Sequence, residues 1–246
     1  MPNIAIFFDD GGVMSNNTVK GEQWKELVPK YFVPRYGGNP ATWSLGNYEC
    51  VQLVIEKVDE LIKSRQDISY EEFQALEDRI MIEHLFTRVG ITPPPEKRYE
   101  TIRRSLEKWV APQINSEVPG IVQAIEILYE RGFTLHTASG ETSWLLEGYL
   151  TGMGVLQYFR NLYGPDLVGI MKGGVKFYEA VFKHAGIDPS CAIVIDDKSE
   201  LLESARQAGA RTIHSCVLNE QVSDGFYRYK DPADLPELVD TILKEY

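Results

Sequence analysis

Two pairs of aspartates, far apart in the chain, are the residues best suited to chemistry. Asp9-Asp10 follows the apolar run Ile4–Phe8, and Asp196-Asp197 follows the apolar run Ala192–Ile195. Carboxylate oxygens are hard ligands, and Mg²⁺ typically takes one or two of them together with waters and phosphate oxygens. A carboxylate can also attack phosphorus to form an acyl phosphate, which divides a hydrolysis into two steps. If the fold brings the pairs together, they predict a Mg²⁺-dependent site for phosphate chemistry.

Hydroxyl side chains and one lysine could complete such a site. Thr137-Ala138-Ser139 ends a third apolar run, and Lys172 stands before a predicted helix, where it could balance the negative charge. Alone, each feature has an ordinary explanation. Paired aspartates after a strand occur in turns, threonine and serine cap helices, and a lone lysine is commonly solvated. Their order and their shared position after strands favour a common site.

Strands and helices alternate after Gly120, which predicts an α/β fold with a doubly wound parallel sheet. In such a sheet the ligand crevice lies at the carboxyl ends of the strands, so polar residues that follow different strands converge there. The predicted strands are Ile4–Phe8, Phe133–Thr137, Asn161–Tyr163, Ala192–Ile195 and Arg211–His214. The predicted helices are Ile121–Glu130, Trp144–Thr151, Gly174–His184, one that ends at Ala208, and Pro232–Tyr246.

The long block between the first strand and Gly120 has a different character. Charged sequence with apolar residues at helical spacing fills Cys50–Arg65, Tyr70–Val89 and Glu96–Trp109. Because this block is too long for a plain crossover between two strands, it predicts a second, smaller, all-helical domain. We expect the α/β core to comprise residues 1–16 and 116–246, and the helical domain to comprise residues 17–115.

Composition limits the partners that the protein can have. A formal net charge of −11 disfavours broad binding of nucleic acid or anionic membranes. An anionic small-molecule substrate would then need local positive charge from a metal ion or a few lysines. Three widely separated cysteines form neither a zinc nor a disulfide pattern. No signal peptide and no bilayer-length apolar run are recognisable, which predicts a cytoplasmic protein, and nothing indicates an oligomeric state.

Four segments together resemble the motifs of the haloacid dehalogenase superfamily of hydrolases. The likeness covers the first fifteen residues and most of the stretch from about Val118 to Ser215, and the helical block stands where that family inserts a helical cap domain. It implies a Rossmann-like α/β core with a helical cap. The segments are Ile6–Val13, Leu135–Ser139, Lys172 with Gly173 in place of the usual proline, and Val194–Asp197 followed by Ala205–Ala210.

The resemblance implies a role for each residue and Mg²⁺ as the cofactor. Asp9 would be the nucleophile and a metal ligand. Asp197 would be the main further ligand, with Asp196 as a neighbour or second ligand and the backbone carbonyl of Gly11 completing the shell. Thr137 and Ala138 would bind the phosphoryl group of a small phosphorylated substrate, and Lys172 would neutralise the nucleophile and phosphate.

Gly11 departs from the pattern. Phosphatases of this family carry a second aspartate there, which protonates the leaving group and activates water, and glycine can do neither. Asp10 follows a nucleophile fixed at a strand end and is expected to point elsewhere. Taking Asp10 as the nucleophile instead would put Val13 where the motif requires glycine, so we reject that register.

Several functions are compatible with this departure. The leading hypothesis is a Mg²⁺-dependent phosphoryl hydrolase acting through an aspartyl-phosphate at Asp9. One alternative is a binding protein that has lost catalysis, and another is a hydrolase of carbon–halogen or carbon–phosphorus bonds. The carbon–phosphorus enzymes use a cap lysine, for which the sequence offers Lys20, Lys25, Lys30 and Lys57. A phosphoacceptor receiver domain is disfavoured because the chain is too long and carries the helical insertion.

Overall fold

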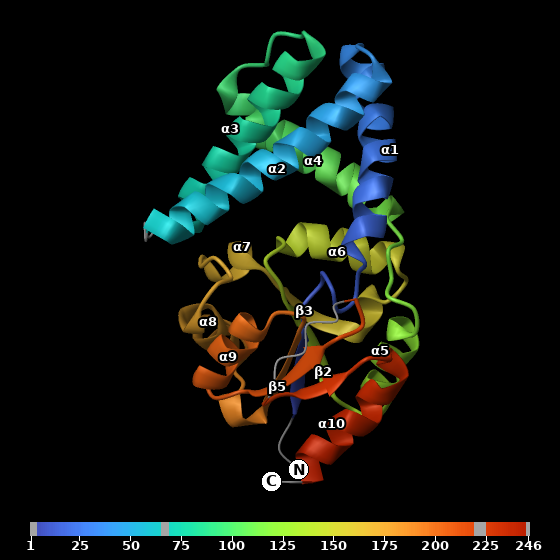
Figure 1. The fold of residues 1–246 in the computed structure, drawn as a ribbon, viewed down its shortest axis with the longest axis vertical. Helices are drawn as coiled ribbons and strands as arrows, with labels where there is room; N and C mark the ends of the chain where they lie inside the picture. Colours follow the sequence, from blue (N-terminus) through green and yellow to red (C-terminus); the bar gives the residue numbers. More distant parts are fainter. Residues whose placement is uncertain (1–3, 65–68, 219–224, 245–246) are drawn as a thin grey trace. The chain divides into compact units, whose positions relative to one another are not determined.

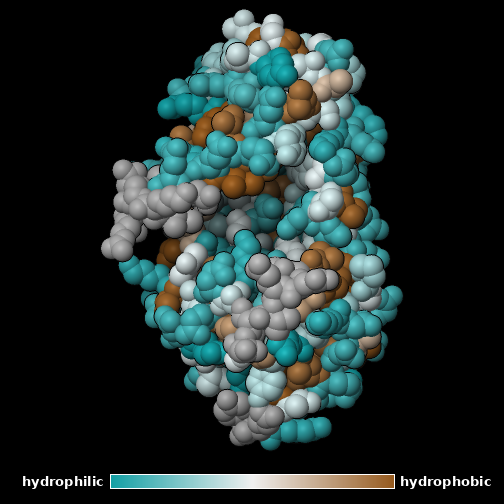
Figure 2. Space-filling view, viewed as in Figure 1, coloured by the Kyte–Doolittle hydropathy of each residue, from teal (hydrophilic) through white to brown (hydrophobic). Residues whose placement is uncertain are grey.

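A computed structural model describes residues 4–64, 69–218 and 225–244 of the chain. The chain divides into two compact units, which we call the α/β domain (Met1–Asn17 and Asn115–Tyr246) and the helical domain (Thr18–Ile114). The boundaries expected from the sequence differ from these by one residue. Within the described ranges, no helix combines the length and the apolar character that a membrane crossing requires. The face drawn in Figure 2 is largely hydrophilic, with hydrophobic residues scattered over it.

The α/β domain is built on a six-stranded parallel sheet, which confirms the predicted fold class (Figure 1). Its order is β3-β2-β1-β4-β5-β6. The chain therefore leaves β1 in one direction to β2 and β3 and returns to build β4, β5 and β6 on the other side. This reversal beside β1 is a topological switch point, where ligands bind in open α/β sheets. The strands are β1 (Ala5–Phe8), β2 (Thr134–Ala138), β3 (Phe159–Tyr163), β4 (Ala192–Asp196), β5 (Arg211–Ser215) and β6 (Tyr227–Tyr229).

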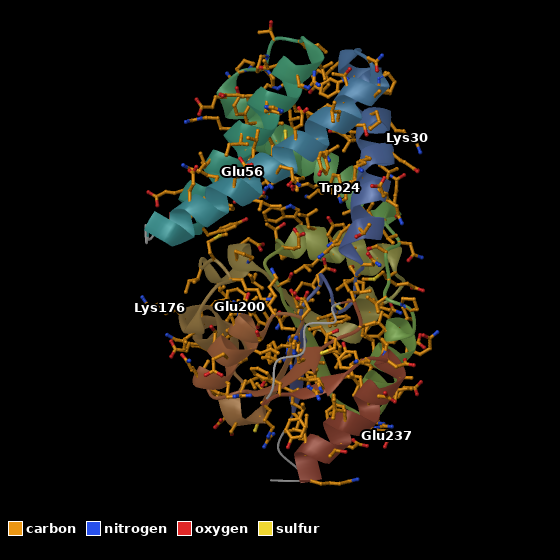
Figure 3. All side chains as sticks on the ribbon, in the orientation of Figure 1. Trp24, Lys30, Glu56, Lys176, Glu200 and Glu237 are labelled. Carbon is orange, nitrogen blue, oxygen red and sulfur yellow. The ribbon has the colours of Figure 1, made fainter. Side chains whose placement is uncertain are left out.

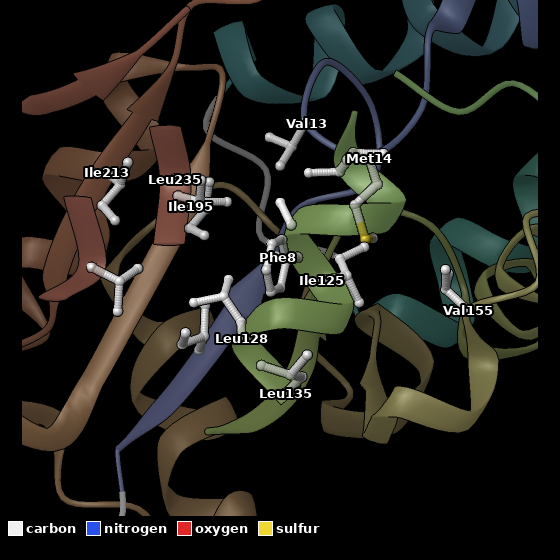
Figure 4. Packing of buried hydrophobic residues seen from close by; sticks show 14 of the residues in the cluster. Phe8, Val13, Met14, Ile125, Leu128, Leu135, Val155, Ile195, Ile213 and Leu235 are labelled. Atoms are coloured by element: carbon white, nitrogen blue, oxygen red, sulfur yellow. The ribbon is translucent and has the colours of Figure 1, made fainter. Parts of the chain in front are cut away.

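Helices cover both faces of the sheet. Because successive strand side chains point to opposite faces, Ile6 and Phe8 pack in one apolar cluster and Ala5 and Phe7 in the other. Helices α5 (Ile121–Glu130) and α10 (Leu235–Lys244) contribute to the first cluster, part of which Figure 4 shows. Helices α8 (Val175–Ala185) and α9 (Ser199–Gln207) contribute to the second. Both faces of β1 are thus buried, as its unbroken apolar sequence indicates.

Two short elements were not predicted. Strand β6 has three residues, Tyr-Arg-Tyr, at the edge of the sheet, which is too short for an alternating pattern. Helix α7 (Pro165–Val168) has four residues after β3. The remaining helix of this domain, α6 (Ser143–Gly152), follows β2 at the predicted place.

The described residues of the helical domain form four main helices, which pack around an aromatic cluster. Phe32 and Trp43 stack with their ring centroids 4.5 Å apart, and Phe86 meets both rings edge-on. The predicted helix Tyr70–Val89 is observed with these bounds, because Ser69 and Glu72 form a capping box at its start and Gly90 ends it in the left-handed conformation. The helices are α1 (Asn17–Tyr36), α2 (Pro40–Ser64), α3 (Tyr70–Val89) and α4 (Tyr99–Val110).

Arg103 of α4 is buried among three carboxylates. Its guanidinium lies 2.7 Å from Glu107 Oε1 and 3.2 Å from Glu77 Oε2, and it also donates to Asp78. Burial raises the pKa of Glu77 and of Asp78, and the charge of Arg103 opposes this rise. The cluster therefore holds more negative than positive charge inside the domain, and Arg103 is its main counter-charge.

We expect Arg103→Leu to lower the free energy of unfolding of the helical domain by about 3–5 kcal/mol at pH 7, because it leaves buried carboxylates unpaired. Urea titration followed by circular dichroism measures the change. Carboxyls with raised folded-state pKa values favour folding most when protonated, so the loss should shrink as the pH is lowered towards 4. The matched control is Arg104→Leu, whose half-exposed pair with Glu100 is worth less than about 1 kcal/mol. Equal losses for the two variants would contradict this account.

Candidate active site

Asp9 stands at the carboxyl end of β1, beside the end of β4. Phe8 is in register with Ile195 and the backbone N–H of Asp9 donates to the Ile195 carbonyl at 2.9 Å, so Asp9 is level with Asp196. The carboxylates of Asp9, Asp196 and Asp197 each offer an oxygen within 4.8 Å of the others. The fold thus brings Asp9 together with the sequence-distant Asp196 and Asp197 at one point on the sheet edge.

Lys172 lies between two of these carboxylates. Its Nζ is 2.9 Å from Asp9 Oδ1 and 2.6 Å from Asp196 Oδ2, and the lysine side chain is only 4% exposed. Burial disfavours the ammonium, but the charges of Asp196 and Asp9 outweigh it and raise the pKa of Lys172 well above its usual range. Burial likewise raises the pKa of Asp9, an effect that Lys172 opposes. Lys172 therefore stays charged and favours the ionised form of the carboxylate beside it.

Asp196 and Asp197 differ in whether a carboxylate oxygen is left without a hydrogen-bond partner. Both oxygens of Asp196 are engaged, Oδ2 by Lys172 and Oδ1 by the backbone N–H of Lys198. Asp197 Oδ1, in contrast, is buried with no hydrogen-bond partner among the described residues. Burial, followed by the charge of Asp9, raises the pKa of Asp197. A buried carboxylate oxygen without a donor is costly, and a cation bound there would offset that cost, so the residues present fit a divalent metal ion.

The loop after β1 is shaped by Gly12 and Asp10. Gly12 has a φ of +80°, and a Cβ on it would lie 2.3 Å from Asp197 Oδ2, so the close approach of that carboxylate requires glycine. Ser215 Oγ donates to the Gly12 carbonyl at 2.9 Å. The Asp10 side chain is fully buried and accepts a hydrogen bond from Ser15 Oγ at 2.7 Å. The Asp10 side chain therefore stabilises the loop that follows β1.

The space beside Gly11 is occupied by Asn17, the first residue of α1. A Cβ on Gly11 would lie 2.7 Å from Asn17 Nδ2, 2.8 Å from Asn17 Oδ1 and 3.1 Å from Asn17 Cγ. A larger side chain at position 11 would therefore have to displace this carboxamide. Sequence reasoning did not single out Asn17, because nothing in the spacing of two residues six positions apart in a loop indicates such a contact.

The structure places Thr137 and Ala138 inside β2 and Ser139 directly after it. Phe8 is in register with Thr137, which places Thr137 inside the strand, one residue short of the level of Asp9. The Thr137 hydroxyl is buried and donates to the Tyr163 carbonyl at 3.2 Å. Ala138 packs its side chain in an apolar cluster and pairs with Tyr163 of β3, so its side chain does not face a ligand. Ser139 is the first residue beyond the strand, and its Oγ accepts from the Glu141 N–H at 3.2 Å while its own O–H makes no hydrogen bond that involves a described residue.

Comparison with known proteins identifies relatives over most of the chain. The model of the family described as haloacid dehalogenase-like hydrolase matches residues 47–215. A phosphoglycolate phosphatase of Aquifex aeolicus (strain VF5) is 26% identical over 132 residues, which are 52% of this chain and 61% of the phosphatase. The chain thus matches about three fifths of the length of that curated relative.

Solved structures share the fold across nearly the whole chain. The 2-haloacid dehalogenase of Pseudomonas syringae pv. Tomato DC3000 superposes with a TM-score of 0.67 at 17% identity, over 98% of this chain and all of the other. The magnesium-bound HAD-hydrolase YfnB of Bacillus subtilis superposes with a TM-score of 0.63 at 13% identity, again over 98% and 100% of the chains. At these identities the likeness establishes the fold alone.

Proposed function

The chain belongs to the haloacid dehalogenase-like hydrolase family, and we propose that it hydrolyses a small phosphorylated metabolite with Mg²⁺, through an aspartyl-phosphate at Asp9. The observation that carries this proposal is the pairing of Asp9 with Lys172 beside a second carboxylate, Asp197, that has a free buried oxygen. A nucleophile and a ligand for a cation then lie at one switch point of the sheet.

Each residue has a defined part in this mechanism. Lys172 holds one oxygen of Asp9 and leaves the other for attack on phosphorus. Asp196 holds Lys172 from the opposite side. Asp9, Asp197 and the Gly11 carbonyl would hold the Mg²⁺, which when bound stabilises the charge on the phosphoryl oxygens. We assign the hydroxyl contact with the phosphoryl group to Ser139 in place of Thr137, because the Thr137 hydroxyl already donates to Tyr163.

The activity is tested on phosphate monoesters and acyl phosphates of small metabolites, each assayed with Mg²⁺ and with EDTA. Turnover that requires Mg²⁺ and exceeds that of an Asp9→Asn preparation supports the proposal. If no compound is hydrolysed above that control, phosphatase activity is abandoned, and the carbon–halogen reaction or a non-catalytic binding function takes its place.

Metal binding gives a separate prediction for Asp197. We expect Asp197→Asn to weaken Mg²⁺ binding at least about tenfold, because a neutral amide oxygen replaces a charged ligand. Isothermal titration with Mg²⁺, or with Mn²⁺ as a spectroscopic substitute, measures it. Asp188→Asn is the matched control. Asp188 lies before β4, at the end opposite to Asp197, and its carboxylate caps a turn, so this substitution should leave Mg²⁺ affinity unchanged. Unchanged affinity in Asp197→Asn would remove Asp197 from the proposed metal site.

Hydrolysis of a carbon–halogen bond is the second candidate, because a halide leaves without a proton and Gly11 offers none. The free oxygen of Asp197 favours the phosphate reaction, since the carbon–halogen reaction has no use for a metal ligand. Release of halide from 2-haloacids that is insensitive to EDTA would favour the carbon–halogen reaction over the phosphate reaction. A lysine-dependent carbon–phosphorus reaction is a third candidate that would rest on Lys20, which is buried on α1. The other three lysines are less suited, because Lys25 and Lys57 pair with neighbouring glutamates and Lys30 is an exposed residue on α1 (Figure 3).

A further inference from the structure

The carboxylates and the lysine nearest Asp9 are already engaged in other interactions. Asp10 accepts from Ser15, and Asp196 accepts from Lys172 and from the Lys198 N–H. Lys172 holds its proton firmly between two carboxylates, so it is a poor acid. Asp197 is the proposed metal ligand. None of these four groups is therefore placed to give a proton to a departing oxygen.

The histidines of the neighbouring strands are also unsuitable. His136 stacks on Phe7 with ring centroids 5.0 Å apart, and burial, together with the charge of Arg160, lowers its pKa to about 4. It is therefore neutral near pH 7. His214 lies with Nε2 3.0 Å from the Asp197 carbonyl, a contact that holds the backbone of the metal-ligand loop. The Tyr178 hydroxyl is buried without a hydrogen-bond partner among the described residues, and burial raises the pKa of this tyrosine, so it too is a poor acid. The Asn17 carboxamide also stands beside the nucleophile loop.

Asn17 has the position for contact with a substrate. Its Nδ2 and Oδ1 are the atoms nearest to a Cβ on Gly11, two residues after Asp9, and the residue is exposed. A carboxamide donates two hydrogen bonds and accepts others, but it does not exchange protons in the pH range where enzymes work. It can orient a leaving group or a water molecule and cannot protonate one.

We propose that Asn17 orients the leaving group and the attacking water, and that the substrate is a phosphorylated compound whose leaving group departs as a stable anion. Acyl phosphates and phosphate esters of acidic hydroxyls belong to this class, whereas phosphate esters of ordinary alcohols do not. This inference rests on the proposed function and adds the chemical class of its substrate.

The two steps balance without an acid or base from the protein. In the first, Asp9 forms a bond to phosphorus and the bond to the leaving oxygen breaks, with its electron pair staying on the departing anion. In the second, water bonds to phosphorus and the Asp9–phosphorus bond breaks, which restores the carboxylate. Both protons of the water remain on the product, which leaves as dihydrogen phosphate.

The test is a series of substrates that differ in the acidity of the leaving group, from acetyl phosphate through aryl phosphates to an alkyl phosphate. The full-length enzyme with Mg²⁺ should lose kcat/KM steeply along the series. Asn17→Asp puts a carboxyl in the space that the amide already fills. Since general acid catalysis is worth about 10²–10⁴-fold, this variant should narrow the ratio of kcat/KM for acetyl phosphate to kcat/KM for the alkyl phosphate at least tenfold.

A second readout is the pH profile. Because the new carboxyl must be protonated to act as an acid, Asn17→Asp should add a decline at high pH for the alkyl phosphate only. The double variant Gly11→Asp/Asn17→Gly places the carboxyl on residue 11, in the space that the Asn17 side chain vacates. It should show the same change in substrate ratio and pH profile as Asn17→Asp. Asn16→Asp is the control, because it adds the same charge one residue earlier, and no atom of Asn16 is among the three nearest to a Cβ on Gly11. It should change neither the ratio of kcat/KM between the two substrates nor the pH profile.

Each outcome decides the matter. Turnover by the unmodified enzyme that hardly depends on leaving-group acidity would show that another group, such as one from the helical domain, supplies the proton, and would overturn the inference while leaving the phosphatase proposal intact. If the ratio of kcat/KM between the substrates is unchanged in both Asn17→Asp and the double variant, the inference is likewise overturned and the phosphatase proposal stands. Absence of any turnover above the Asp9→Asn control would overturn both.

Discussion

Replacing Asp9 by asparagine is expected to lower kcat for the phosphorylated substrate at least about 10³-fold, the scale seen when a nucleophile is removed from a hydrolase. An amide is neutral and a poor nucleophile, and the substitution would leave Lys172 with Asp196 as its remaining charged partner. Initial rates with acetyl phosphate and Mg²⁺ measure the change.

The fold should survive this substitution, because asparagine has the shape of aspartate and burial already raises the pKa of Asp9. A melting temperature equal to or above that of the unmodified protein is therefore expected, and it serves as the control for folding. Turnover within about tenfold of the unmodified enzyme would assign the chemistry to another residue.

The second large effect concerns Lys172. Lys172→Met removes the ammonium between Asp9 and Asp196 and leaves two buried carboxylates without their counter-charge. We expect a loss of about 3–5 kcal/mol in the free energy of unfolding, the range measured when one partner of a buried ion pair is removed. Activity should also fall, by at least about 10²-fold, because the phosphate and the nucleophile then repel each other without compensation.

Urea unfolding and kinetics on the same samples test both parts of the Lys172 prediction. Lys176→Met is the matched control, since Lys176 is exposed on the first turn of α8 and points away from the domain (Figure 3). It should change stability by less than about 0.5 kcal/mol. A Lys172→Met protein as stable as this control would mean that the ion pairs contribute little to folding.

The stability of the Lys172→Met variant should also depend on pH. Without the lysine, the folded-state pKa of Asp9 rises further above its unfolded value. A group of this kind favours folding below its unfolded pKa and loses that contribution as the pH rises through its folded pKa. The deficit relative to the unmodified protein should therefore be largest near pH 7 and should shrink as the pH is lowered towards 4.

Much of the fold follows from local patterns in the sequence. The unbroken apolar runs before Asp9 and Asp196 predicted strands of a parallel sheet, and strands of this kind are covered on both faces. Helix Tyr70–Val89 was predicted from apolar residues at helical spacing, and the observed helix has the same bounds, with Ser69 capping its start and Gly90 ending it. Strand β6 was missed because three residues at a sheet edge depend on pairing with β5, which local sequence does not encode.

The candidate site was predictable in part. Asp9, Asp196, Asp197 and Lys172 could be brought together from the rule that ligands bind at the carboxyl ends of parallel strands. The phosphoryl contact was predicted for Thr137 from the sequence, whereas we propose Ser139 for it, because the register of β1 with β2 and the hydrogen bond from the Thr137 hydroxyl to Tyr163 are not encoded in local sequence. Asn17 was missed for a similar reason, since its contact with Gly11 depends on how the loop folds back on itself.

The covalent intermediate gives the most direct test of the central claim. The protein with Mg²⁺ is mixed with a ³²P-labelled acyl or aryl phosphate and quenched in acid within a single turnover, and the labelled peptide is then mapped by mass spectrometry. We predict one phosphoryl group, labile to hydroxylamine, on the peptide that contains Asp9, and none in Asp9→Asn. Turnover without label on Asp9, or label on another residue, would contradict the assignment of Asp9 as the nucleophile.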